Sequence, residues 1–144
     1  VMNEEALALG ATNSHFVNAN GLPDDDHYTT VYDMYLIFQE AVKSQAFVDI
    51  IKTKSIDVTY QDANGNDVNK TWNNTNHYLT GETEAPEGIT VIGGKTGTTN
   101  AAGYCLVLYS NNKKGEDIIS IVYKSDGRSN MYLLMNQILS TFAN

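Results

Sequence analysis

The residues best suited to chemistry are Lys95, Thr96, Gly97 and Thr98, within a glycine-rich run at residues 92–103. Lys95 offers a compact cation with three hydrogen-bond donors, and Thr96 offers a hydroxyl. A ligand could lie against the backbone of Gly97, and the Thr98 amide could donate to an oxyanion. Such a strand edge would hold an anionic, peptide-like substrate. The alternative is an ordinary glycine-rich strand end with an exposed lysine, because short motifs often match by chance.

An antiparallel sheet with a covering helix must position these residues. Two β-branched residues precede two glycines at residues 91–94, which suits a strand that another group approaches closely. The pattern predicts strands near residues 89–97, 102–110 and 118–124, joined tightly enough to be antiparallel. Apolar residues then recur at helical spacing, and this last helix should pack them on the sheet. These apolar residues are Met131, Leu134, Met135, Ile138, Leu139 and Phe142.

Residues 1–52 are expected to form a helical part. A first helix ends at Gly10, and an irregular loop follows it. Thr30 can cap the next helix, with Asp33 in its first turn, and a short helix should begin after Ser44.

Residues 53–88 are expected to form a hairpin and a loop. Asn64-Gly65 is a strong hairpin-turn signal, and the acidic segment 81–88 contains a proline. The nearby Asp and Asn residues do not fit a calcium loop, because the glycine falls one place early and no glutamate closes the loop.

Composition excludes several function classes. The chain has 144 residues, 42% hydrophobic and 18% charged, which indicates a globular piece of one domain. A net charge of −8 argues against nucleic-acid binding. Cys105 is the only cysteine, and the three histidines lack ligand spacing, so we expect no metal site and no cofactor. Cys105 itself is predicted to be a small buried hydrophobe.

Blocks along nearly the whole chain resemble the D-alanyl-D-alanine carboxypeptidases, the low-molecular-mass penicillin-binding proteins. The resemblance is weakest in residues 45–72. It implies an α+β, β-lactamase/transpeptidase-like fold, in which residues 1–144 supply the C-terminal portion, with the three strands and last helix in residues 89–144. The blocks are Met2-Asn3, Leu9–Thr12, His15–Asn18, Asn20–Leu22, Tyr28–Met34, Asn74–Leu79, Gly94–Thr99 and Ala102–Val107.

The resemblance also implies roles for the site residues. Lys95 matches the lysine of the Lys-Thr-Gly motif, which supports hydrogen bonding and positive potential at the site. Thr96 matches the hydroxyl that helps bind the substrate carboxylate, and Thr98 matches the amide that completes the oxyanion hole. Gly97 keeps the strand edge open. The family's serine nucleophile, in Ser-x-x-Lys, and its Ser-x-Asn motif are expected upstream of Met2.

Two positions need separate treatment. Ser110 formally begins a Ser-x-x-Lys sequence, but it lies in a predicted strand and turn, whereas the catalytic motif needs a helix. Family members often use an arginine to hold the substrate's terminal carboxylate. Lys124 and Arg128 are both near that position, and neither matches it cleanly.

The resemblance predicts a serine D,D-carboxypeptidase acting outside the cytoplasm of a bacterium. Its ligands would be the D-Ala-D-Ala end of peptidoglycan stem peptides and β-lactams. This chain would be inactive alone, and its exposed sheet edge or apolar face would pair with the missing half of its domain. The alternatives are a serine β-lactamase relative and a non-catalytic module that binds muropeptides or a partner protein.

Overall fold

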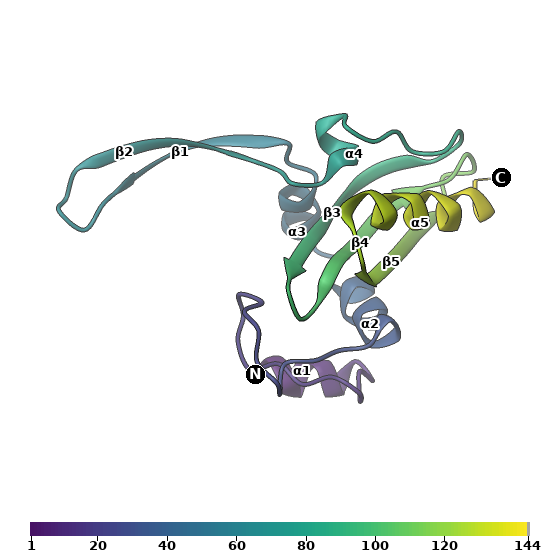
Figure 1. The fold of residues 1–144 in the computed structure, drawn as a ribbon, viewed down its shortest axis with the longest axis horizontal. Coiled ribbons are helices and arrows are strands. Elements are labelled where there is room, and N and C mark those ends of the chain that lie inside the picture. The colour runs from purple at the N-terminus through teal and green to yellow at the C-terminus, as the bar shows by residue number, and fades with distance from the viewer. Residues whose placement is uncertain (144) are drawn as a thin grey trace.

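The computed structural model describes residues 1–143 and forms an α+β structure around a three-stranded antiparallel sheet (Figure 1). None of the helices described in these residues has both the length and the hydropathy that crossing a membrane requires. In chain order the elements are α1 (Met2–Ala8), α2 (Val31–Ala41), α3 (Gln45–Ile51), β1 (Ser55–Gln61), β2 (Asp67–Asn73), α4 (His77–Thr80), β3 (Thr90–Thr99), β4 (Gly103–Asn111), β5 (Asp117–Ser125) and α5 (Arg128–Thr141).

The three predicted strands are present as β3, β4 and β5, paired in that order. Thr96 pairs with Leu106, and Leu108 pairs with Ser120. The register of β3 shifts between Val91 and Gly93, which marks a bulge at the glycine pair. The strand that carries the candidate residues is therefore an edge strand of this sheet.

Helix α5 covers one face of the sheet (Figure 1). Met135 and Leu139 have no exposed surface, and they pack with Leu106 and Leu108 of β4 in the larger core. The expectation was wrong for Leu134 and Phe142, which are exposed. The buried face of α5 therefore differs from the face that the apolar spacing predicts, because Tyr132 packs in the core and Leu134 and Phe142 do not. The other buried members of this core are Ile89, Val122, Met131 and Ala143.

Helices α2 and α3 cover the opposite face through a smaller core built on Phe38, Ile51 and Val107. The end of α3 comes very close to the bulge of β3. A Cβ atom added at Gly93 would lie 2.6 Å from the carbonyl oxygen of Ile51. The predicted close approach to this glycine is therefore made by the protein's own helix.

The segment between α1 and α2 is held at two points. Asn3 exchanges hydrogen bonds with the backbone of Phe16, at 3.1 and 2.7 Å. The buried carboxylate of Asp33 accepts from the amide of Asn13 and the hydroxyl of Ser14, both at 2.7 Å. The predicted Thr30 cap is confirmed, since its hydroxyl accepts from the Asp33 amide. Asp33 thus tethers the loop in addition to its place in the first helical turn.

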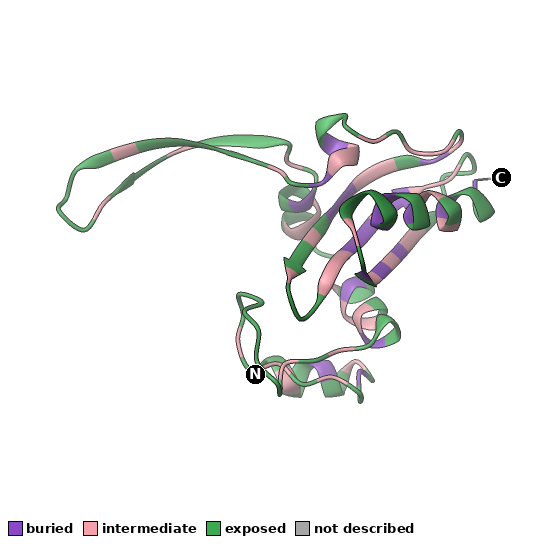
Figure 2. Ribbon diagram, viewed as in Figure 1, coloured by how far each residue is buried: buried purple, intermediate pink, exposed green. Residues whose placement is uncertain are grey.

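Strands β1 and β2 form the predicted hairpin, which projects well clear of the rest of the chain (Figure 1). Gly65 adopts a left-handed φ of +81° at its tip, as the Asn-Gly signal predicts. At its base the side chain of Asn74 donates to the Thr53 carbonyl at 2.8 Å. Figure 2 shows that the hairpin is mostly exposed, whereas the buried residues gather in the sheet and its helices.

Candidate functional site

The four predicted site residues lie on the outer part of the edge strand β3. Lys95, Gly97 and Thr98 are exposed, and Thr96 is half-buried. A Cβ atom at Gly97 would meet no heavy atom within 4 Å, in contrast to Gly93 on the same strand. Strand β3 is therefore covered by other parts of the protein at Gly93 and uncovered at Gly97, where a ligand can approach it.

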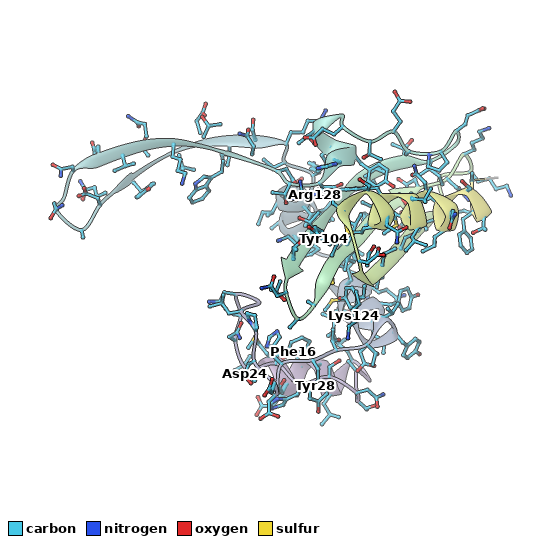
Figure 3. All side chains as sticks on the ribbon, in the orientation of Figure 1. Phe16, Asp24, Tyr28, Tyr104, Lys124 and Arg128 are labelled. Atoms are coloured by element: carbon cyan, nitrogen blue, oxygen red, sulfur yellow. The ribbon has the colours of Figure 1, made fainter. Side chains whose placement is uncertain are left out.

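This open end lines a hollow of about 800 Å³, which we call the Lys95 hollow. Its second side is the segment between α1 and α2, and Thr75 and the first turns of α5 complete it. Figure 3 shows Arg128 and Tyr104 on the sheet side and Phe16 on the opposite loop. Residues far apart in the sequence thus surround the Lys-Thr-Gly strand.

The Lys95 hollow is a positive site in a negative chain. Lys95 and Arg128 both line it, and no aspartate or glutamate of the described residues does. The chain as a whole carries a net charge of −8. The electrostatic potential in the hollow is therefore positive although the chain as a whole is acidic, and a positive potential suits an anionic ligand.

Only one of the two candidate carboxylate-binding cations lies in this hollow. Lys124 instead lines a neighbouring hollow of about 500 Å³, beside Cys105 and Tyr123. Lys124 has a φ of +56°, an uncommon conformation for a residue with a side chain. The guanidinium of Arg128 makes no hydrogen bond or ion pair within the described residues, so it is available to a ligand.

Cys105 differs from its prediction. It is only half-buried, and its thiol lies 3.4 Å from the Ala102 carbonyl oxygen. The apolar run around it predicts burial, but Cys105 pairs with Gly97 at the open end of β3 and lines the neighbouring hollow. Cys105 is therefore less buried than the apolar residues that follow it on β4.

Thr75 lines the candidate site, although the sequence did not single it out. Its hydroxyl lies 2.5 Å from the hydroxyl of Thr96, and it lines the Lys95 hollow. Asn76 holds this segment by capping α4, since its side-chain oxygen accepts from the Tyr78 amide at 3.2 Å. The only signal for Thr75 was its place in a matched block, because nothing in its local sequence specifies a contact 21 residues away.

Tyr132 and His77 brace this region against α5. Their rings stack at a centroid distance of 4.7 Å, and the His77 amide donates to the Tyr132 hydroxyl at 2.8 Å. His77 Nε2 also lies 2.9 Å from a Glu82 carboxylate oxygen. Burial raises the pKa of Tyr132, partly offset by the hydrogen bond from His77. Tyr132 thus lines the hollow as a neutral, fixed ring.

Ser110 lies outside the hollow. It is buried on β4 and pairs with Val91, at the end of the sheet away from the site. Lys113, the lysine of the formal motif, lies 3.2 Å from Glu87 in an exposed ion pair. Neither residue lines the Lys95 hollow, so Ser110 and Lys113 do not form a nucleophile and base there.

Comparison with known proteins decides the family. The family model described as D-alanyl-D-alanine carboxypeptidase matches residues 1–127. This chain belongs to the D-alanyl-D-alanine carboxypeptidase family. The D-alanyl-D-alanine carboxypeptidase of Streptomyces sp. strain K15 is 32% identical over 125 residues, which are 86% of this chain and 40% of that protein. The enzyme DacF of Bacillus subtilis strain 168 is 33% identical over 116 residues, 79% of this chain and 26% of DacF.

Solved structures agree with this family assignment. A mutant of the Streptomyces K15 DD-transpeptidase matches with a TM-score of 0.84 and 30% identity, covering 99% of this chain and 53% of that one. The D-alanyl-D-alanine carboxypeptidase from Mycobacterium tuberculosis H37Rv matches in fold, with a TM-score of 0.76 and 24% identity, covering 99% and 52%. The carboxypeptidase-family chain therefore has the DD-transpeptidase fold and spans about half the length of these structures.

Proposed function

We propose that this chain forms the substrate-binding side of a serine D,D-carboxypeptidase that removes the terminal D-alanine from peptidoglycan stem peptides. The observation that carries the proposal is the Lys95 hollow, which has two cations and, among the described residues, no carboxylate beside an open strand edge. A stem peptide ends in a carboxylate and has an extended backbone, so it matches both features. Family membership supports the same substrate.

Each residue of the edge has a role in this proposal. Lys95 supplies positive potential to the reacting region, and Thr96 donates its hydroxyl to the terminal carboxylate. Arg128 is the second cation for that carboxylate, in preference to Lys124. The Thr98 amide donates to the oxyanion, and Gly97 leaves room for the substrate backbone.

The nucleophile is proposed to come from a Ser-x-x-Lys segment outside these 144 residues, since no serine in residues 1–143 lines the hollow. Its Oγ would attack the carbonyl of the D-Ala-D-Ala bond and form an ester as the amine of D-alanine leaves with a proton. Water would then hydrolyse the ester and restore the serine. β-Lactams would acylate the same serine, and the reaction would take place outside the cytoplasm, where peptidoglycan lies.

A second candidate is a non-catalytic module that binds muropeptides. The same absence of a lining serine among the described residues favours it. The two candidates differ in whether D-alanine is released once a Ser-x-x-Lys segment is present.

The first test measures the intact mass of the chain after incubation with a penicillin. We expect no covalent adduct and a folded circular dichroism spectrum. A stoichiometric adduct would place a nucleophile within residues 1–144, with Ser110 the first suspect, and would overturn the proposed arrangement. Adding the upstream segment should produce both the adduct and D-alanine release, whereas binding without release would favour the non-catalytic module.

The second test titrates the chain with a peptide ending in D-Ala-D-Ala. Lys95→Ala and Arg128→Ala should each weaken binding by about tenfold or more, because a hydrogen bond to a charged group is lost. Lys113→Ala removes the same charge far from the hollow and is the matched control. Lys124→Ala should also have little effect, and a larger loss with Lys124→Ala than with Arg128→Ala would reverse the assignment of the second cation.

A further inference from the structure

The β1–β2 hairpin has one apolar face and one polar face. Cross-strand partners point to the same side, so the seven pairs alternate between the two faces, with three pairs on one face and four on the other. One face carries Ile56 with Trp72, Val58 with Lys70, and Tyr60 with Val68. The opposite face carries Ser55, Asn73, Asp57, Thr71, Thr59, Asn69, Gln61 and Asp67. We call the first set the hairpin face.

The hairpin face is not covered by the described chain. Ile56, Tyr60 and Trp72 are 51%, 44% and 53% exposed, and neither hydrophobic core contains a hairpin residue. Figure 1 shows the hairpin extending away from the sheet and helices. Contiguous exposed apolar side chains at the surface commonly mark an interaction site.

The base of the hairpin joins the candidate substrate site. Strand β2 ends at Asn73, and Thr75 shares its 2.5 Å hydrogen bond with Thr96 of the Lys-Thr-Gly motif. The chain therefore runs directly from the base of the hairpin, next to Trp72, into the wall of the Lys95 hollow. A long substrate could occupy both at once.

The chemistry of the hairpin face suits a polysaccharide. Trp72 and Tyr60 lie two pairs apart, about 13 Å along the strands, with Lys70 between them. Aromatic rings offer flat faces to the C–H side of a sugar ring, and their polar tips can bond its hydroxyls. Lys70 supplies only donors, which complements the oxygen acceptors along a sugar chain.

Charge argues against one alternative occupant, an anionic membrane surface. The hairpin carries Asp57, Asp62 and Asp67, and the chain has a net charge of −8. Such a surface would repel this segment.

We propose that the hairpin face binds the glycan strand of peptidoglycan while the attached stem peptide occupies the Lys95 hollow. This inference rests on the proposed function, because continuity with the peptide site selects the glycan among possible occupants. It assigns the hairpin to substrate recognition, with Trp72 and Tyr60 as stacking residues and Lys70 as a donor between them.

The fluorescence of Trp72 provides a direct test, because it is the only tryptophan in the chain. The full 144-residue chain is titrated with peptidoglycan glycan strands from which an amidase has removed the stem peptides. We expect a saturable shift of the emission to shorter wavelength as a sugar covers the indole. Unchanged emission at saturating strand concentration would overturn the proposal.

Variants locate the contact. Tyr60→Ala keeps the tryptophan signal and should weaken glycan binding by about fivefold or more, through loss of ring stacking. Gln61→Ala is its neighbour on the opposite face and should bind as the unmodified chain does. Trp72→Ala, followed by calorimetry, should lose most of the affinity, and equal effects of Tyr60→Ala and Gln61→Ala would overturn the assignment of this face.

Other occupants give distinct outcomes. A shift that grows with protein concentration alone, with a dimeric mass abolished by Trp72→Ala, would show that a second copy covers the face. A shift with anionic lipid vesicles and none with glycan would show a membrane contact. Either result overturns the glycan proposal. Because the strands lack peptides, failure here leaves the D-alanine release assay to judge the proposed function separately.

Discussion

The three-stranded sheet and the β1–β2 hairpin are both amphipathic antiparallel structures, yet they differ in what covers them. Leu106 and Leu108 of β4 have no exposed surface beneath α5. Ile56 and Trp72 of the hairpin are about half-exposed. The alternation of apolar and polar residues along a strand therefore predicts which side chains share a face. Whether that face is buried depends on whether another part of the chain, or a ligand, packs against it.

The same contrast occurs within one strand. Gly93 of β3 is pressed against the end of α3, whereas Gly97 faces open space. One glycine serves packing and the other serves access. Gly93 therefore resembles the buried core. Gly97 resembles the hairpin face, because the protein leaves both of these uncovered.

The largest expected change in stability distinguishes a core side chain from a side chain of the hairpin. Met135→Ala removes a fully buried side chain between α5 and the sheet, and should lower the free energy of unfolding by about 2–5 kcal/mol. Trp72→Ala removes a larger but exposed side chain, and should lower it by less than about 1 kcal/mol. Urea unfolding followed by far-ultraviolet circular dichroism measures both. Equal losses would show that the hairpin face is part of the cooperative fold.

The next effect separates the two glycines. Gly93→Ala places a methyl group against the Ile51 backbone and should destabilise the chain by about 1–3 kcal/mol. Gly97→Ala should change stability by less than about 0.5 kcal/mol, because its Cβ meets nothing, but should weaken binding of a D-Ala-D-Ala peptide. Unfolding and peptide titration of both variants are compared. A Gly97→Ala chain that binds normally would contradict an open edge used by the ligand.

Alkaline pH should produce the smallest change in stability, and this change should come from tyrosines outside the hairpin. Burial raises the pKa of Tyr78 and Tyr123 above the ordinary value of 10.0. The folded state therefore holds these protons more tightly than the unfolded state. Their contribution to stability is complete below pH 10.0 and is lost progressively as the pH rises above it.

Thermal unfolding midpoints between pH 9 and 11 measure this loss, with the pH range set by the ordinary tyrosine pKa of about 10. Tyr78→Phe should reduce the slope, since phenylalanine has no proton to lose. Tyr78 donates to the Asn136 side chain at 2.8 Å, so this variant will also lower stability at neutral pH. A slope unchanged by Tyr78→Phe would show that other groups cause the alkaline loss.

Features set by local sequence were predictable. The Thr30 cap, the Asn64-Gly65 turn and the three strands depend on residues close together in the chain. The Lys-Thr-Gly edge was also visible, because its residues are consecutive on β3.

Features set by distant contacts were not predictable. Whether Arg128 or Lys124 lines the Lys95 hollow depends on where the chain turns after β5, and the contact of Thr75 with Thr96 depends on the docking of α4. The pattern of α5 also includes Leu134, whose exposure follows from how the helix is rotated on the sheet.

The hydrogen bond between Thr75 and Thr96 has a further consequence for ligand recognition. Each hydroxyl has one proton, and either can be the donor in the free chain. When a carboxylate accepts the proton of Thr96, Thr96 must in turn accept the proton of Thr75. The two hydroxyls then form a directed pair that points toward the anion. Under the proposed function, Thr75 therefore orients the Thr96 hydroxyl toward the carboxylate of the peptide.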